Sequence, residues 1–113
     1  MKKEIKESWI AALRSGEYKK GKGALLSNGK YCCLGVLTNL WCKETGRKWK
    51  MDKYGYGFIG SEDNYLPKPV MKWAGLESQN PYVKDEALST WNDSLGYGFK
   101  RIATLIEKGI PDE

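Results

Sequence analysis

The chain of 113 residues contains no histidine, the side chain that most often serves as a general base and as a zinc ligand. This absence excludes a Cys-His hydrolase and a His-ligated metalloenzyme. Cysteine is also scarce: the three residues include one adjacent pair, Cys32-Cys33, and offer neither a disulfide framework nor the CxxC spacing of a zinc site. No carboxylate cluster resembles a calcium loop. The sequence therefore predicts no metal and no cofactor.

Long apolar runs are missing as well. No stretch approaches the roughly 18 consecutive apolar residues of a membrane-spanning helix. The segment Met1–Glu7 has no apolar run after its lysines, which predicts neither a signal peptide nor a membrane anchor. We expect a cytoplasmic protein with reduced thiols and no membrane partner.

Aromatic residues and positive charge are well represented. Five Trp, seven Tyr and two Phe make up an aromatic fraction of 12%, which is high enough to suggest that some rings lie at a binding surface. Lysine and arginine total 19 against 14 acidic residues, and the net charge of +5 favours an anionic partner. The alternative is that this charge serves solubility alone.

The spacing of apolar residues predicts a single small α+β domain over residues 1–113. We expect an N-terminal helix over 3–15, a β-hairpin over 24–33 with its turn at Asn28-Gly29, and a central helix over 34–45. The remaining expected elements are a strand over 47–51, a long aromatic loop to residue 64, a short helix over 66–75, a strand over 87–91, helix-capping residues at 92–94, and a C-terminal helix over 98–108.

A set of residues spread along nearly the whole chain resembles a family of small bacteriophage and prophage proteins. The shared residues are Trp9, Ala12-Leu13, Ser15-Gly16, Tyr18, Gly21-Lys22-Gly23, Leu25, Cys32-Cys33-Leu34-Gly35-Val36-Leu37, Leu66-Pro67, Val70, Trp73-Ala74-Gly75-Leu76, Asn92-Asp93, Phe99, Ile102-Ala103 and Ile106-Glu107. The resemblance implies a phage-encoded protein in the bacterial cytoplasm, where small basic early proteins often counter host defence. It implies no activity for any position.

Two groups of residues are weak candidates for catalysis. Cys32 or Cys33, at a strand-to-helix junction, could be activated by the helix dipole, but no histidine is present as its base, and both suit a core. Asp93 and Glu107 could form an acid–base pair, although Asn92-Asp93 is more typical of a helix cap. We predict no enzymatic activity.

A binding site for a small phosphorylated ligand, such as a nucleotide, is the stronger prediction. The basic loop from Tyr18 to Gly23 offers glycine amides and lysines to a phosphate, although it lacks P-loop spacing and could be a solvated turn. Tyrosines of the aromatic loop would stack on a base, and Asn92 would read a base edge or a ribose hydroxyl. The predicted ligand-binding residues are Tyr18, Lys20, Lys22, Tyr54, Tyr56, Trp91, Asn92, Asp93 and Arg101.

These observations favour a phage counter-defence protein that sequesters a nucleotide-type immune signal, either a cyclic nucleotide or an ADP-ribose derivative. The alternative is a protein–protein inhibitor of a host defence enzyme, acting through an aromatic and arginine-containing patch. Nucleic acid is a less favoured partner because acidic residues interrupt the basic ones along the sequence. A homo-oligomer, in particular a dimer, is expected because two small chains can enclose a nucleotide more readily than one.

Overall fold

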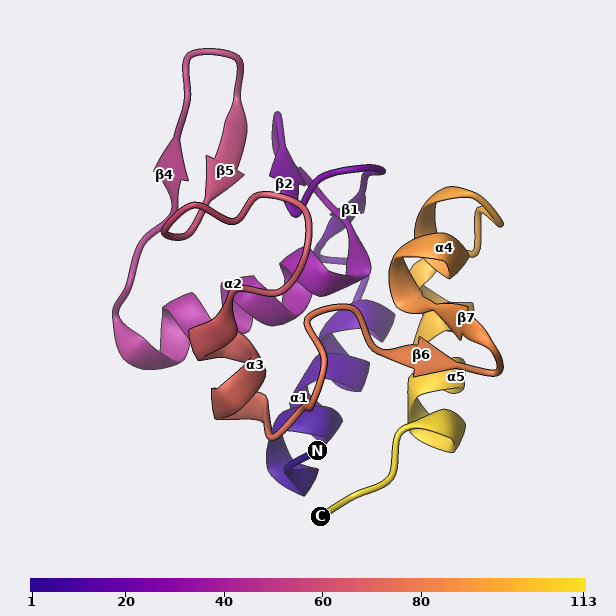
Figure 1. Ribbon diagram of the computed structural model, residues 1–113. Coiled ribbons are helices and arrows are strands. Elements are labelled where there is room, and N and C mark those ends of the chain that lie inside the picture. Colours follow the sequence, from indigo (N-terminus) through magenta and orange to yellow (C-terminus); the bar gives the residue numbers. More distant parts are fainter.

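Helices α1 and α5 lie side by side and carry much of the core of the computed structural model, which describes residues 1–113 (Figure 1). Trp9 and Leu13 of α1 are buried, as are Ile102 and Ile106 of α5. In both helices the buried residues recur at intervals of three or four, so that one face is apolar. The helices are α1 (Lys3–Arg14), α2 (Cys33–Thr45), α3 (Lys68–Ala74), α4 (Leu88–Asp93) and α5 (Phe99–Gly109).

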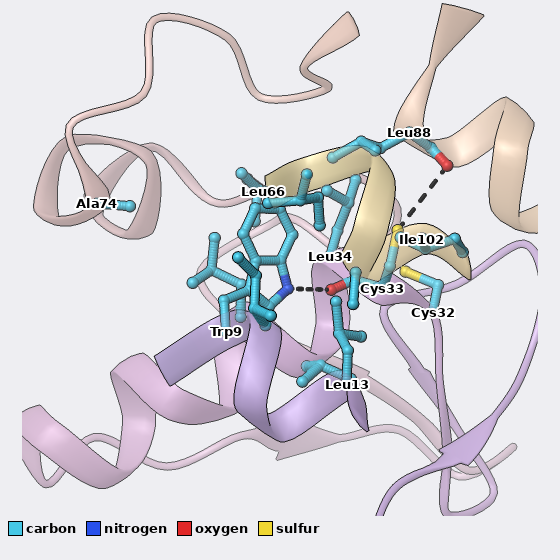
Figure 2. Close-up of a cluster of buried hydrophobic side chains, with 14 of the residues drawn as sticks. Trp9, Leu13, Cys32, Cys33, Leu34, Leu66, Ala74, Leu88 and Ile102 are labelled. Atoms are coloured by element: carbon cyan, nitrogen blue, oxygen red, sulfur yellow. Dashed lines mark hydrogen bonds between the residues drawn. The ribbon is translucent and has the colours of Figure 1, made fainter. Parts of the chain in front are cut away.

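Helix α2 runs through the middle of the molecule, and its first residue is held from two sides. The Trp9 indole donates a hydrogen bond of 2.9 Å to the Cys33 carbonyl (Figure 2). The Cys33 backbone N–H donates to the Asn92 side chain of α4 at 3.2 Å. The thiol of Cys32 accepts from the Gly35 backbone N–H and so caps the helix. We call this region, made of Cys32, Cys33, Gly35, Trp9 and Asn92, the α2 start.

A mixed sheet of five short strands has the order β1-β3-β2-β5-β4. Its strands are β1 (Lys19–Lys20), β2 (Leu26–Ser27), β3 (Lys30–Tyr31), β4 (Lys50–Met51) and β5 (Tyr56–Phe58). The turn between β2 and β3 has positive φ at both Asn28 and Gly29, as predicted from the Asn-Gly pair. A separate hairpin consists of β6 (Tyr82–Val83) and β7 (Glu86–Ala87).

The α+β class is confirmed, as are the N-terminal, central, short and C-terminal helices and the first hairpin. The predicted strand over 87–91 is wrong, because residues 88–93 form α4. Leu88 and Asn92, its buried residues, are one helical turn apart. The apolar residues of this short segment fit the spacing of a strand as well as that of a helix, so their periodicity alone could not distinguish the two.

Two other predictions need correction. The aromatic segment after residue 51 is not a simple loop, since β5 lies within it and pairs with both β2 and β4. Its glycines concealed the alternation of Tyr56 and Phe58. The capping residues predicted at 92–94 do not cap the last helix, whose N-cap is Gly98 without a side-chain hydrogen bond. No helix combines the length and apolarity needed to cross a membrane.

Candidate functional site

The structure separates the predicted ligand-binding residues into several locations. Asn92 is fully buried, and its amide is engaged in three hydrogen bonds. Its oxygen accepts from the Cys33 N–H, and its nitrogen donates to the Gly21 carbonyl at 2.9 Å and to the Asp93 carboxylate at 2.7 Å. An amide engaged in this way holds α4, α2 and the 18–23 loop together and has no atom free for a ligand.

Lys20 is also directed inward. Its ammonium group donates a hydrogen bond of 2.7 Å to the backbone carbonyl oxygen of Asn92. Partial burial, followed by the neighbouring positive charge of Lys22, lowers the pKa of Lys20 from its ordinary value. Lys22 itself is exposed on the loop. Of the two lysines predicted to bind a phosphate, one is therefore engaged with the backbone of α4.

The three segments predicted to form the site do meet, around a small hollow of about 240 Å³. Gly23 comes from the basic loop, Tyr65 from the aromatic segment and Asp93 from α4. The lining contains a carboxylate and no cation, however, so this hollow disfavours a phosphate.

The predicted tyrosines lie elsewhere. The hydroxyl of Tyr18 accepts a hydrogen bond of 2.9 Å from Asn39, and its ring packs edge-on against Tyr31 at 5.0 Å. Tyr54 and Tyr56 are exposed and belong to the β4–β5 hairpin, which Figure 1 shows on the opposite side of the molecule from α4 and α5. These two tyrosines therefore share no pocket with Trp91 or Arg101.

Trp91 and Arg101, the two remaining predicted residues, line a groove of about 410 Å³ between α4, α5 and the β6–β7 turn. The Trp91 indole donates to the Val83 carbonyl at 2.9 Å, which fixes its ring, and the Tyr97 ring lies 4.8 Å away. The Arg101 guanidinium stands 3.6 Å from the centre of the Tyr97 ring, within the range of a cation–π contact. This α4–α5 groove is lined by Lys84, Trp91, Tyr97, Lys100, Arg101, Thr104 and Leu105.

The groove carries three cations and no acid. The two ion pairs of the chain join Lys6 to Asp112 and Arg14 to Glu107, so none of the groove cations is paired. Lys100 and Arg101 also lie in the first turn of α5, where the helix dipole disfavours positive charge. An anion bound in the groove would relieve both the mutual repulsion and the unfavourable dipole contact.

Lys84 has an unusual backbone conformation. It occupies the two-residue turn between β6 and β7 with a φ of 50°, and Asp85 follows with 67°. Such turns favour Gly and Asn, and a lysine there is uncommon. Strained residues of this kind cluster at functional sites.

Sequence reasoning missed Lys84, Tyr97 and Lys100 as members of one groove. The spacing of four residues between Tyr97 and Arg101, at the start of a helix, is a signal that could have paired the ring with the guanidinium. No signal pointed to Lys84, because the β6–β7 turn lacks the usual glycine or asparagine.

A cavity of about 440 Å³ lies where the two chain ends meet. Its lining includes the carboxylates of Glu77, Asp112 and Glu113, and the Met1 ammonium group donates to the Pro111 carbonyl. Three acids make this cavity unsuitable for a phosphorylated ligand.

The buried thiols are poor nucleophiles. Burial raises the pKa of the Cys32 thiol from its ordinary value near 9 to about 11, and it also raises the pKa of the Cys33 thiol well above its ordinary value. Desolvation thus outweighs the helix dipole that could have activated them. No three cysteine, aspartate or glutamate side chains come together as metal ligands.

The chain was also compared with known protein families, curated proteins and solved structures. No curated protein and no solved structure matches the chain. A family model described as a domain of unknown function (DUF8296) matches residues 1–110, and the chain therefore belongs to this family.

Proposed function

We propose that this protein binds a small phosphorylated molecule of nucleotide type in the α4–α5 groove and sequesters it. The observation that carries the proposal is the combination of three unpaired cations with a Trp–Tyr pair in one groove. A volume of about 410 Å³ falls within the range of roughly 300–1,000 Å³ typical of small-molecule sites.

Each group has a distinct part in this proposal. The rings of Trp91 and Tyr97 offer apolar surface to a base, and their fixed positions reduce the entropy lost on binding. Lys84, Lys100 and Arg101 approach the groove from two elements and would neutralise phosphate oxygens. The first N–H groups of α5, which has no side-chain cap, supply further donors.

Sequestration requires affinity and no catalytic group, which agrees with the high pKa values of the buried thiols. The resemblance to bacteriophage proteins supports a cyclic nucleotide or an ADP-ribose derivative of a bacterial immune system as the ligand. Such a protein would act in the bacterial cytoplasm and counter host defence by lowering the free concentration of the signal.

A dimer remains part of the proposal. The α4–α5 groove is a surface feature, and a second copy would increase the fraction of a nucleotide removed from water. Light scattering at micromolar concentration, with and without ligand, tests this expectation. A strict monomer in both conditions would contradict it.

Calorimetric titration with cyclic dinucleotides and ADP-ribose tests the groove itself. Losing one charge-assisted hydrogen bond costs about 1.5–3 kcal/mol, so Arg101→Ala should weaken binding by roughly 10- to 150-fold. Lys3→Ala removes the same charge from the exposed start of α1 and serves as the control. If Lys22→Ala weakens binding while Arg101→Ala does not, the ligand binds at the basic loop and the groove proposal fails.

A further inference from the structure

The strand register aligns a second group of cations and aromatic rings on the sheet, away from the α4–α5 groove. Directly paired residues of neighbouring strands place their side chains on the same face. The pairs Lys19↔Lys30, Lys30↔Ser27 and Ser27↔Tyr56 therefore form one row across four strands. Neighbouring strands lie about 4.8 Å apart, so the row spans about 14 Å.

A second row lies two residues further along β5. Phe58 follows Tyr56 on the same face because side chains alternate along a strand, and it pairs with Lys50 of the edge strand β4. Tyr56, Lys19, Lys30 and Lys50 are exposed, and Phe58 is half-buried. We call the surface made of Lys19, Lys30, Lys50, Tyr56 and Phe58 the open sheet face.

The other face of the sheet is directed inward. Leu26 is buried, the Tyr31 ring packs against the core cluster, and Lys20 reaches the Asn92 carbonyl. Tyr56 and Phe58 are absent from both the core cluster and the residues packed against it. The chain has only two phenylalanines, and this one is left partly in water.

The charge of the open sheet face is almost entirely positive. Its three lysines form no ion pair. The nearest acid along β4 is Asp52, whose carboxylate accepts the backbone N–H groups of Tyr54 and Tyr56 at 2.8 and 3.0 Å and so stabilises the turn. At the hairpin tip the Lys53 ammonium lies 5.2 Å from the centre of the Tyr54 ring, which extends the basic and aromatic character.

We infer that the open sheet face binds single-stranded nucleic acid. Splayed bases stack on aromatic side chains of a sheet, and lysines beside the rings bind the phosphates. The open sheet face and the α4–α5 groove belong to different elements, so binding at one does not depend on binding at the other. A duplex fits less well, because its bases are stacked on one another and cannot reach Tyr56 and Phe58.

The test is fluorescence anisotropy with a labelled dT20 strand and, for comparison, its duplex with dA20, at low and moderate salt. We expect the single strand to bind more tightly than the duplex. Tyr56→Thr, which keeps a residue that favours strands, should weaken binding by about 5- to 150-fold, the equivalent of about 1–3 kcal/mol per stacked base. Tyr82→Thr removes an exposed tyrosine of β6 and should leave binding unchanged.

A second variant keeps the test valid if Tyr56→Thr fails to fold. Each phosphate that a lysine neutralises on a single strand contributes about 0.7 to the slope of log affinity against log salt. Lys30→Gln should reduce the slope by this amount. Lys3→Ala, at the exposed start of α1, should leave both the affinity for dT20 and this slope unchanged.

Three results would overturn the inference: no anisotropy change with dT20, equal effects of Tyr56→Thr and Tyr82→Thr, or displacement of dT20 by poly-glutamate at equal charge. The last result would mean that the face attracts any acidic polymer, including an acidic protein segment. Failure of nucleotide binding in the groove would leave each of these measurements unaffected.

Discussion

The α2 start and the α4–α5 groove each contain one of two adjacent residues of α4, Asn92 and Trp91. The two regions differ in whether their polar and charged groups have partners within the protein. Asn92 is directed inward, and every atom of its amide is hydrogen-bonded. Trp91 is directed toward a groove whose three cations have no anionic partner. A region that satisfies its own polar groups is built for stability, whereas unpaired charge beside fixed aromatic rings is typical of a binding site.

Gly35→Ala should produce the largest effect in the α2 start. A methyl group at Gly35 would collide with the backbone carbonyl of Leu25, which cannot rotate away as a side chain can. Although alanine favours helix by about 1 kcal/mol, we expect a net loss of at least about 3 kcal/mol in the free energy of unfolding. Denaturant titration measures the change.

Gly98→Ala is the matched control for that variant. An added methyl group at Gly98 meets no atom within 4 Å, and its φ of −70° suits any residue. We expect a loss of at most about 1 kcal/mol, from the weaker N-cap. Equal losses for the two variants would contradict the close approach of α2 to residue 25.

Asn92→Ala tests whether this residue is structural or binds the ligand. The variant leaves the Cys33 N–H and the Gly21 carbonyl without their partner, and we expect a loss of about 2–4 kcal/mol in the free energy of unfolding. Asn64→Ala, on the exposed surface, should change stability by less than about 0.5 kcal/mol. A stable Asn92→Ala variant that no longer binds its ligand would restore the prediction that Asn92 reads the nucleotide.

The thiol of Cys32 makes the stability of the α2 start depend on pH. Burial raises its pKa from near 9 in the unfolded chain to about 11 in the folded protein. Above pH 9 the unfolded state therefore binds fewer protons than the folded state, and stability falls as pH rises to 11. A difference of two pKa units amounts to about 2–3 kcal/mol.

Comparison with Cys32→Ser isolates this contribution from the tyrosines and lysines that titrate in the same range. Serine keeps an oxygen to accept the Gly35 N–H, and it does not ionise. The unfolding free energies of the wild type and of Cys32→Ser, measured between about pH 8 and 11, should converge, because only the wild type loses stability through ionisation of this thiol. Parallel curves would show that the Cys32 thiol is not shielded from water.

The sequence predicted the elements whose signals are local. Asn28-Gly29 fixed a hairpin turn, and Gly46 and Gly75 marked the ends of α2 and α3, where φ is indeed 74° and 73°. The parallel pairing of β1 with β3 could not be predicted from the sequence, because the paired residues are 11 positions apart and are not joined by a hairpin turn.

The site was less predictable than the fold for a related reason. The sequence identified the kinds of residue that bind phosphates and bases, but of the residues that line the hollow where the three segments meet it predicted only Asp93. Which way a side chain points is decided by packing. Burial turned Asn92 and Lys20 inward, and the distance between elements left Tyr54 and Tyr56 on another surface.

The last prediction concerns the β6–β7 turn beside the groove, where we expect a smaller change in stability than for the variants of the α2 start. Lys84 and Asp85 both have positive φ in the same turn, but only Lys84 lines the groove. Glycine at either position should raise the free energy of unfolding by about 0.5–1 kcal/mol, because it adopts this conformation without steric cost. We expect Lys84→Gly to weaken nucleotide binding by about tenfold or more and Asp85→Gly to leave it unchanged or slightly stronger. Thermal denaturation and calorimetry on both variants measure the two quantities. A Lys84→Gly variant that gains stability and keeps full affinity would mean that the strained lysine serves no ligand.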